Sequence, residues 1–339
     1  MEKSKVYFTT MKTSFSENLP QKLERLIKTA GIGNIDFSNK YAAIKMHFGE
    51  PGNLAYLRPN YASVVVKVIK ELGGKAFLTD CNTLYVGGRK NALDHIDAAY
   101  QNGFSPFSTG CHVIIADGLK GTDEELVPVE GGEYVKEAKI GRAIMDADVF
   151  ITLSHFKGHE ATGFGGALKN IGMGCGSRAG KMEMHNAGKP YVEQESCIGC
   201  GRCIGVCPMD AVCTPGDESN DILNRKIAEY SKAVVTGRPH FHISLVVDVS
   251  PNCDCHSEND IPIVPDVGMF ASFDPVALDV ACADAVNKQP VISGSQLDRM
   301  PHVHHDHFID SAPETNWHSC IEHAVKIGLG SDQYELIEI

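Results

Sequence analysis

The stretch YAAIKMHFGEPGNLAYLRPNYASVVVKVIKELGGKAFLTD, residues 41–80, decides the fold class of this chain. A mostly apolar run at 41–48 predicts a buried strand, and a second apolar run at 75–79 predicts another. Between them Pro59 opens a helical pattern, which Gly73 and Gly74 end. A strand, a helix and a strand in this order predict a βαβ unit with two parallel strands.

The same alternation continues on both sides of this unit. Further strands are predicted at 5–9, 112–116, 149–153, 241–247, 267–271 and 334–337, and helices at 20–30, 92–101, 139–145, 222–234, 275–286 and 317–327. We therefore expect an α/β fold with a mostly parallel sheet covered by helices on both faces. Residues 1–190 and 217–339 form its two parts, and residues 191–216 form a small ferredoxin-like, cysteine-rich insertion between them.

Composition narrows the class of protein. The 339 residues carry a formal net charge of −12, which is unfavourable for sequence-independent binding of nucleic acid. We find no apolar run of the roughly 18 residues that a membrane span needs, and no apolar segment typical of a signal peptide at the N-terminus. Twelve cysteines without an export signal favour reduced thiols and metal ligands, so we expect a cytoplasmic protein. The oligomeric state is not predicted.

The cysteine run CIGCGRCIGVCP at 197–208 is the most specific motif. Its C-x2-C-x2-C-x3-C-P spacing predicts one [4Fe–4S] cluster bound by Cys197, Cys200, Cys203 and Cys207. The alternative is a zinc site, although zinc sites usually use paired C-x2-C arms with a longer spacer. In two-cluster ferredoxins the fourth cysteine binds the other cluster, but this chain has no second run, so Cys207 is the expected fourth ligand. Cys253 and Cys255, in a C-x-C pair, are additional candidates for metal ligands.

Polar residues follow five of the predicted strands. Ligands of open parallel sheets bind outside the carboxyl ends of the strands, so these residues are expected at one edge. They are His47, Glu50, Asn53, Asp80, Asn82, Asp117, Ser154, His155, Lys157, His159, Asp248 and the pair Cys253 and Cys255. The alternative interpretation is that loops are polar anyway and that aspartates cap helices.

The segment SHFKGHEATGFGGALKNIGMGCGSRAGK at 154–181 predicts an anionic-ligand site. Its glycines precede a short helix, and free N–H groups at a helix N-terminus attract anions. We expect Lys169, Asn170, Gly165, Gly166 and His47 to bind the ligand. The alternative is a glycine-packed interface without a ligand.

Three side chains near this segment are the candidate catalytic groups. They are His155, His159 and Lys157. Histidine titrates near neutral pH and suits general acid–base chemistry.

These motifs resemble one known family over nearly the whole chain. KMHFGEPGN, LTDCNTLYVGGRKNALDH, the segment at 154–181, the cysteine run and DVSPNCDCHSENDIPIVPDVGMFASFDPVALD are similar to the domain-of-unknown-function family 362, in its ferredoxin-containing branch. The resemblance implies an α/β scaffold, distantly similar to that of lactate racemase, with a 4Fe–4S insertion. Many similar members carry two cysteine runs, and this chain carries one.

Three functions remain open from the sequence. The first is a redox protein that carries one [4Fe–4S] cluster, coupled to the anionic-ligand site, with a redox partner protein or a small anionic molecule as its partner. The second is an α/β enzyme, an oxidoreductase or another class, that acts on an anionic substrate and has a structural cluster. The third is a metal-handling or maturation factor, suggested by Cys253, Cys255 and the fifteen histidines.

Overall fold

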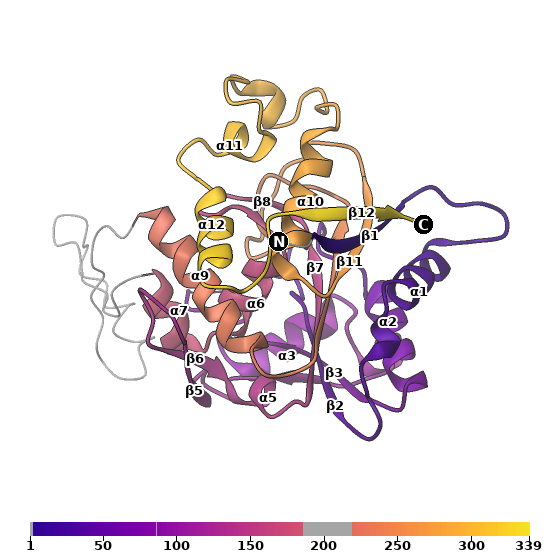
Figure 1. The fold of residues 1–339 in the computed structure, drawn as a ribbon, viewed down its shortest axis with the longest axis vertical. Helices are drawn as coiled ribbons and strands as arrows, with labels where there is room; N and C mark the ends of the chain where they lie inside the picture. Colours follow the sequence, from indigo (N-terminus) through magenta and orange to yellow (C-terminus); the bar gives the residue numbers. More distant parts are fainter. Residues whose placement is uncertain (1–2, 86, 186–218) are drawn as a thin grey trace.

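A computed structural model describes residues 3–85, 87–185 and 219–339. The predicted insertion at 191–216 and the cysteine run therefore lie outside the described residues. The described chain is built on a large mixed sheet with helices on both faces (Figure 1), which confirms the predicted α/β class.

The main sheet has eight strands among the described residues. In spatial order they are β12 (Tyr334–Glu338), β1 (Ser4–Thr10), β11 (Gly268–Ser272), β10 (His240–Val246), β7 (Val149–His155), β2 (Tyr41–Lys45), β3 (Lys75–Asp80) and β4 (Val113–Ile115). Strand β11 pairs antiparallel with both of its neighbours, and the other adjacent pairs are parallel. As a result β10, β7, β2, β3 and β4 all end at the same edge of the sheet.

Each face of the sheet is covered by its own helices. One core contains residues of α1 (Leu19–Thr29), α2 (Pro59–Glu71) and α3 (Ala92–Gln101). The other contains residues of α6 (Ala167–Cys175), α9 (Asn220–Val235), α10 (Pro275–Asn287) and α12 (His318–Lys326). Strand β2 supplies both cores, because Ala42 and Ile44 point to the first and Ala43 points to the second.

Shorter elements complete the described chain. They are α4 (Pro106–Thr109), α5 (Arg142–Met145), α7 (Arg178–His185), α11 (His307–Ser311), the 3₁₀ helices η1 (Ile32–Asn34) and η2 (Leu297–Arg299), and two antiparallel pairs, β5 (Glu124–Pro128) with β6 (Glu137–Gly141) and β8 (Lys157–His159) with β9 (Gly163–Gly165). Among the described residues, no helix has the length and apolar character needed to cross a membrane.

Local signals explain where the principal helices begin. Asn18 caps α1 in a reciprocal capping box with Gln21, and Asp274 caps α10 ahead of Pro275. Both starts fall within a residue of the predicted ones.

One predicted helix is wrong. Residues 139–145 form the end of β6 and then the four-residue helix α5. In this segment Ala138 and Ile140 are buried on alternate positions, which is the two-residue period of a strand, and β5 provides the pairing partner. The predicted strand at 41–48 is also shorter than expected, since β2 ends at Lys45.

Candidate functional site

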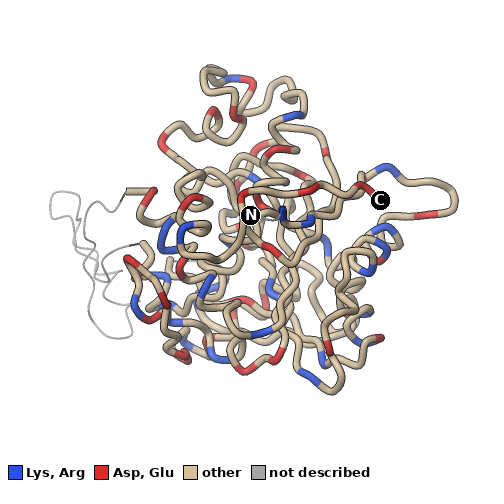
Figure 2. The backbone as a smooth tube through the Cα atoms, viewed as in Figure 1, with Lys and Arg blue, Asp and Glu red and all other residues tan. Residues whose placement is uncertain are grey.

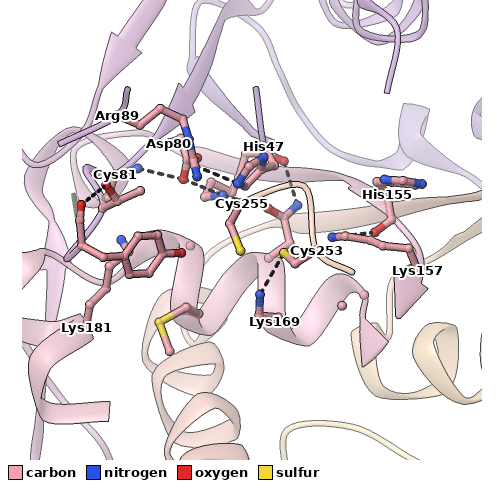
Figure 3. Close-up of a pocket in the computed structure, with 18 residues that line it drawn as sticks. His47, Asp80, Cys81, Arg89, His155, Lys157, Lys169, Lys181, Cys253 and Cys255 are labelled. Carbon is pink, nitrogen blue, oxygen red and sulfur yellow. Dashed lines mark hydrogen bonds and ion pairs between the residues drawn. The ribbon is translucent and has the colours of Figure 1, made fainter. Parts of the chain in front are cut away.

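The carboxyl ends of β2, β3, β7 and β10 surround a small cavity of about 70 Å³, here called the inner cavity (Figure 3). Its lining includes ten of the predicted strand-edge and ligand residues: His47, Asp80, His155, Lys157, Gly165, Gly166, Lys169, Asn170, Cys253 and Cys255. The predicted convergence at one sheet edge is therefore present. Seven others of the expected strand-edge residues do not line this cavity: Glu50, Asn53, Asn82, Asp117, Ser154, His159 and Asp248.

A second cavity adjoins the first and is here called the outer cavity. It has a volume of about 390 Å³ and shares Tyr85, Lys169, Lys181 and Cys255 with the inner one. The predicted residue His159 lines this outer cavity.

Lys45, which the sequence analysis did not single out, anchors the floor of the inner cavity. It lies at the end of β2, is 1% exposed and makes an ion pair of 2.9 Å with Asp80. Its Nζ also donates to Oδ1 of Asn170 over 2.8 Å. Burial alone raises the pKa of Asp80, but Lys45 and neighbouring cations outweigh it and hold that pKa below its usual range.

Arg89 is the second unpredicted cation and comes from the loop after β3. Its Nε donates to Glu50 over 2.7 Å, and its Nη1 lies 2.7 Å from Nε2 of His47. Burial first, and then the charge of Arg89, lower the pKa of His47 well below its usual value, so this imidazole is neutral. The buried Nη2 of Arg89 has no hydrogen-bond partner among the described residues.

Asp254 organises the β7 side of the cavity. It accepts a hydrogen bond of 2.9 Å from Nδ1 of His155, whose Nε2 donates to the backbone carbonyl of Val247 over 2.8 Å. Both ring nitrogens of His155 are therefore occupied within the protein, which suits a positioning role. Lys157 lies 3.7 Å from Asp254, and burial, which lowers its pKa, is outweighed by Cys253 and Asp254, which raise it.

Contrary to the expectation from the sequence, the N–H groups at the N-terminus of α6 are not free for an anion, because they are already bonded. The N–H groups of Ala167 and Leu168 donate to the buried carboxylate of Asp279 over 2.6 and 2.8 Å. Gly166 permits this approach, because a Cβ there would lie 2.7 Å from Cγ of Asp279. Gly165 and Gly166 still line the cavity, but its positive charge comes from lysine and arginine side chains.

Helix α6 also presents Lys169 and Asn170 to the site. Nδ2 of Asn170 donates to the backbone carbonyl of Lys45 over 3.1 Å and to Oγ of Ser154 over 3.0 Å, so it joins β2, β7 and α6. Lys169 donates from Nζ to Sγ of Cys253 over 3.3 Å. Asn170 therefore has a structural role, whereas Lys169 contacts the sulfur of Cys253.

The two cysteines of the C-x-C pair form a cluster with His159. One nitrogen of His159 and the two Sγ atoms lie within 4.8 Å of one another, which is a spacing that can hold a metal ion. A hydrogen bond from Cys255 and the neighbouring lysines lower the pKa of Cys253 well below its usual value, whereas the same contact and burial raise the pKa of Cys255. Burial lowers the pKa of His159.

The cations of the pocket are far apart in the sequence and meet only through folding. Figure 2 shows Lys and Arg interleaved with Asp and Glu along the described backbone.

Lys45 and Arg89, which were not predicted as site residues, differ in how clearly the sequence marks them. Lys45 interrupts an otherwise apolar strand, and a lysine at that position is a sequence signal for a buried charge at the strand end. Arg89 lies in a glycine-containing loop without periodicity, and no local pattern marks it.

The predicted cluster ligands Cys197, Cys200, Cys203 and Cys207 lie outside the described residues, so their role stays a prediction. Two described residues, one before and one after that segment in the sequence, line the outer cavity: His185, at the end of α7, and Leu223, near the start of α9.

Comparisons with known proteins give distant structural likenesses. The lactate racemase apoprotein from Thermoanaerobacterium thermosaccharolyticum is 14% identical with a TM-score of 0.43, over 71% of this chain and 51% of that one. A protein from Thermotoga maritima is also 14% identical, with a TM-score of 0.42, over 78% of this chain and 57% of its own. This chain thus spans little more than half the length of either structure. A search of curated proteins gave no match.

The family model is the informative match. It covers residues 42–284, more than two thirds of the chain, and includes every described residue that was assigned to the inner cavity. The chain belongs to the family described as Domain of unknown function (DUF362).

Proposed function

We propose that this protein is an iron–sulfur redox protein that binds a small anionic molecule at the strand edge. In this proposal Cys197, Cys200, Cys203 and Cys207 hold one [4Fe–4S] cluster, which exchanges single electrons with the bound anion or with a redox partner protein. The anion-binding part of the proposal rests on the concentration of cations around the inner cavity, and the cluster part rests on the spacing of the cysteine run.

Charge on the cavity wall favours an anion. Five cationic side chains line the inner cavity, and these are Lys45, Arg89, Lys157, Lys169 and Lys181. One carboxylate, Asp80, lines it with them, and Lys45 is already paired with that group. The unpartnered Nη2 of Arg89 offers a buried donor of the kind that binds carboxylate and phosphate oxygens.

The size of the cavity limits the ligand. A volume of about 70 Å³ is several times the roughly 10–15 Å³ that one buried water needs, so the part of the ligand that enters must be a small group such as a carboxylate or phosphate. A larger remainder would extend into the outer cavity. There it would lie beside His185 and Leu223, which line that cavity.

The chain's own groups have distinct tasks in this proposal. Lys157 and Arg89 hold the anion, and Asp254 and His155 keep Lys157 in place. His159 lines the outer cavity, and because its Nδ1 accepts two backbone N–H groups, the proton on its Nε2 is the one that this ring can pass to the ligand.

Equilibrium binding of small anions tests this proposal. Phosphate, acetate and a two-carbon hydroxy acid are titrated calorimetrically into the anaerobically purified protein and into Lys157→Met. The matched control is Lys288→Met, because Lys288 is exposed at the end of α10. We expect at least one anion to bind, with Lys157→Met weakening it roughly tenfold or more, as expected for loss of a charge-assisted hydrogen bond. The anion site is refuted if none binds, or if Lys157→Met and Lys288→Met have equal affinities.

A further inference from the structure

Cys253 and Cys255 form a sulfur pair between the two cavities that the proposed cluster does not use. Both are free thiols in the structure. Cys253 is buried and lines the inner cavity, and Cys255 lines both cavities. Figure 3 shows the two sulfur atoms next to each other, with Lys169 reaching Cys253.

A tight turn holds the two sulfurs together. The N–H of His256 donates to the carbonyl of Cys253 over 3.1 Å, which closes a turn over residues 253–256. Between the cysteines, Asp254 points to the other side and is bound by His155 and Lys157. Because Asp254 is fixed there, the Sγ atoms of Cys253 and Cys255 stay within 4.8 Å of each other.

The hydrogen bonds of His159 show whether this ring can bind a metal or can only donate to a cysteine thiolate. Its Nδ1 accepts the N–H groups of Ala161 and Thr162 over 3.0 and 3.2 Å, so the neutral ring carries its proton on Nε2. The proton cannot move to Nδ1, which faces these two N–H groups, so Nε2 keeps it and offers no lone pair to a metal. His159 therefore acts toward Cys253 as a donor, as Lys169 does.

Charge around the pair leads to the same conclusion. The ammonium group of Lys169 contacts Sγ of Cys253, and Lys157 adds a second positive charge to its surroundings. Two ammonium groups oppose the entry of a divalent cation, but they stabilise a thiolate. A sulfur anion beside a second sulfur is the arrangement that thiol–disulfide exchange requires.

We infer that Cys253 and Cys255 form a redox-active dithiol that converts to a disulfide by exchange with a low-molecular-weight disulfide. This inference goes beyond the proposed function, because it adds a two-electron centre that is separate from the cysteine run.

The exchange balances in two steps. Cys253 is the thiolate that Lys169 contacts, and it acts as the base that takes the proton of Cys255, which faces the outer cavity. The Cys255 thiolate attacks the disulfide RSSR, an S–S bond forms between Cys255 and R, and RS⁻ leaves. The thiol of Cys253 gives its proton to RS⁻ and then displaces the second RS⁻. Overall, the singly ionised dithiol and RSSR give the protein disulfide, RSH and RS⁻, so that two electrons pass to RSSR.

The outer cavity provides access for this reaction. Its volume of about 390 Å³ holds a small disulfide next to Cys255, whereas the inner cavity is too small. The exchange partner is therefore a small molecule that enters from the His159 side.

A redox titration tests the inference. The full-length protein is equilibrated anaerobically in mixtures of reduced and oxidised dithiothreitol, quenched with acid and alkylated. Mass spectrometry then measures the peptide that contains residues 253 and 255. We expect one intramolecular disulfide with a single midpoint, lost in Cys253→Ser and in Cys255→Ser, and retained in the control Cys320→Ala. Lys169→Met should favour the disulfide roughly tenfold, because it removes a charged hydrogen bond to the thiolate, whereas Lys288→Met should leave the midpoint unchanged.

Two results overturn the inference. One is that both thiols remain alkylated at the most oxidising mixture. The other is that the purified protein retains about one equivalent of zinc or another thiophilic metal, which is lost in Cys255→Ser. Neither result affects the proposed cluster or the anion site, since iron content and anion affinity are measured separately on Cys255→Ser.

Discussion

Gly166→Ala tests whether the carboxylate of Asp279 fixes the start of the helix that carries Lys169 and Asn170. Gly166 has a φ of −132°, which alanine adopts without strain, so the substitution acts through space alone. The added Cβ would lie 2.7 Å from Cγ and 2.9 Å from Oδ2 of Asp279, and closer still to Oδ1. Ordinary contact begins at 3.4 Å, so the carboxylate must withdraw.

The energetic cost follows from the bonds that would be lost. The two N–H···O bonds from Ala167 and Leu168 measure 2.6 and 2.8 Å, and a shift of this size breaks both. Two buried backbone donors that lose a carboxyl partner cost about 2–4 kcal/mol of unfolding free energy. We expect this loss in urea unfolding, and weaker anion binding because α6 forms part of the wall of the inner cavity through Lys169 and Asn170.

Controls make the prediction specific. Gly33→Ala introduces a Cβ with nothing within 4 Å and should change stability little. In an Asp279→Ala background, Gly166→Ala should cost almost nothing further, because the clash partner is gone. If Gly166→Ala is within about 0.5 kcal/mol of Gly33→Ala, which is the usual range for a neutral surface substitution, the packing argument is wrong.

Three further predictions concern buried charges. Burial raises the pKa of Asp279 to about 7, so between pH 4 and 7 the native state keeps a proton that the unfolded chain releases. The wild type should therefore lose stability relative to Asp279→Asn as the pH rises through this window. A stability difference in urea unfolding that stays constant over these pH values contradicts the prediction. Glu229 accepts backbone N–H groups at residues 133–135 and a bond of 2.8 Å from His323, so Glu229→Ala should cost about 3 kcal/mol or more in urea unfolding, and a loss below about 1 kcal/mol refutes the role. Lys45→Met leaves Asp80 buried without its principal partner and should lower the free energy of unfolding by about 3–5 kcal/mol. The double variant Lys45→Met/Asp80→Asn should recover part of this stability, and additive losses in it would contradict the prediction.

Local signals were sufficient for the framework of this fold. Pro59, Asn18 and Asp274 mark helix starts through short-range capping, and apolar runs mark the buried strands that they connect. The sheet edge could be predicted as well, since parallel strands must end together. The pairing of β5 with β6 could not, because a strand partner ten or more residues away outweighed the helical pattern at 139–145.

The chemistry of the site was only partly predictable. His47, His155, Lys157, Cys253 and Cys255 were recognised because each follows a strand. The contacts of these residues depend on folding. His155, for example, is hydrogen-bonded to Asp254.

The anion-binding N-terminus that the glycines suggested is another example. It is filled by Asp279, more than a hundred residues away in the chain. Arg89 was missed for the same reason, because its partners Glu50 and His47 come from a different strand end.

The central claim is that the chain carries one [4Fe–4S] cluster on its cysteine run, and iron and acid-labile sulfide analysis with EPR tests it most directly. Anaerobically purified protein should contain about four irons and four sulfides per chain and give the signal of a reduced cluster with dithionite. Cys200→Ser should lose the cluster, whereas Cys253→Ser should keep it. A colourless protein that contains zinc and no iron, or a cluster that disappears in Cys253→Ser, would contradict the account.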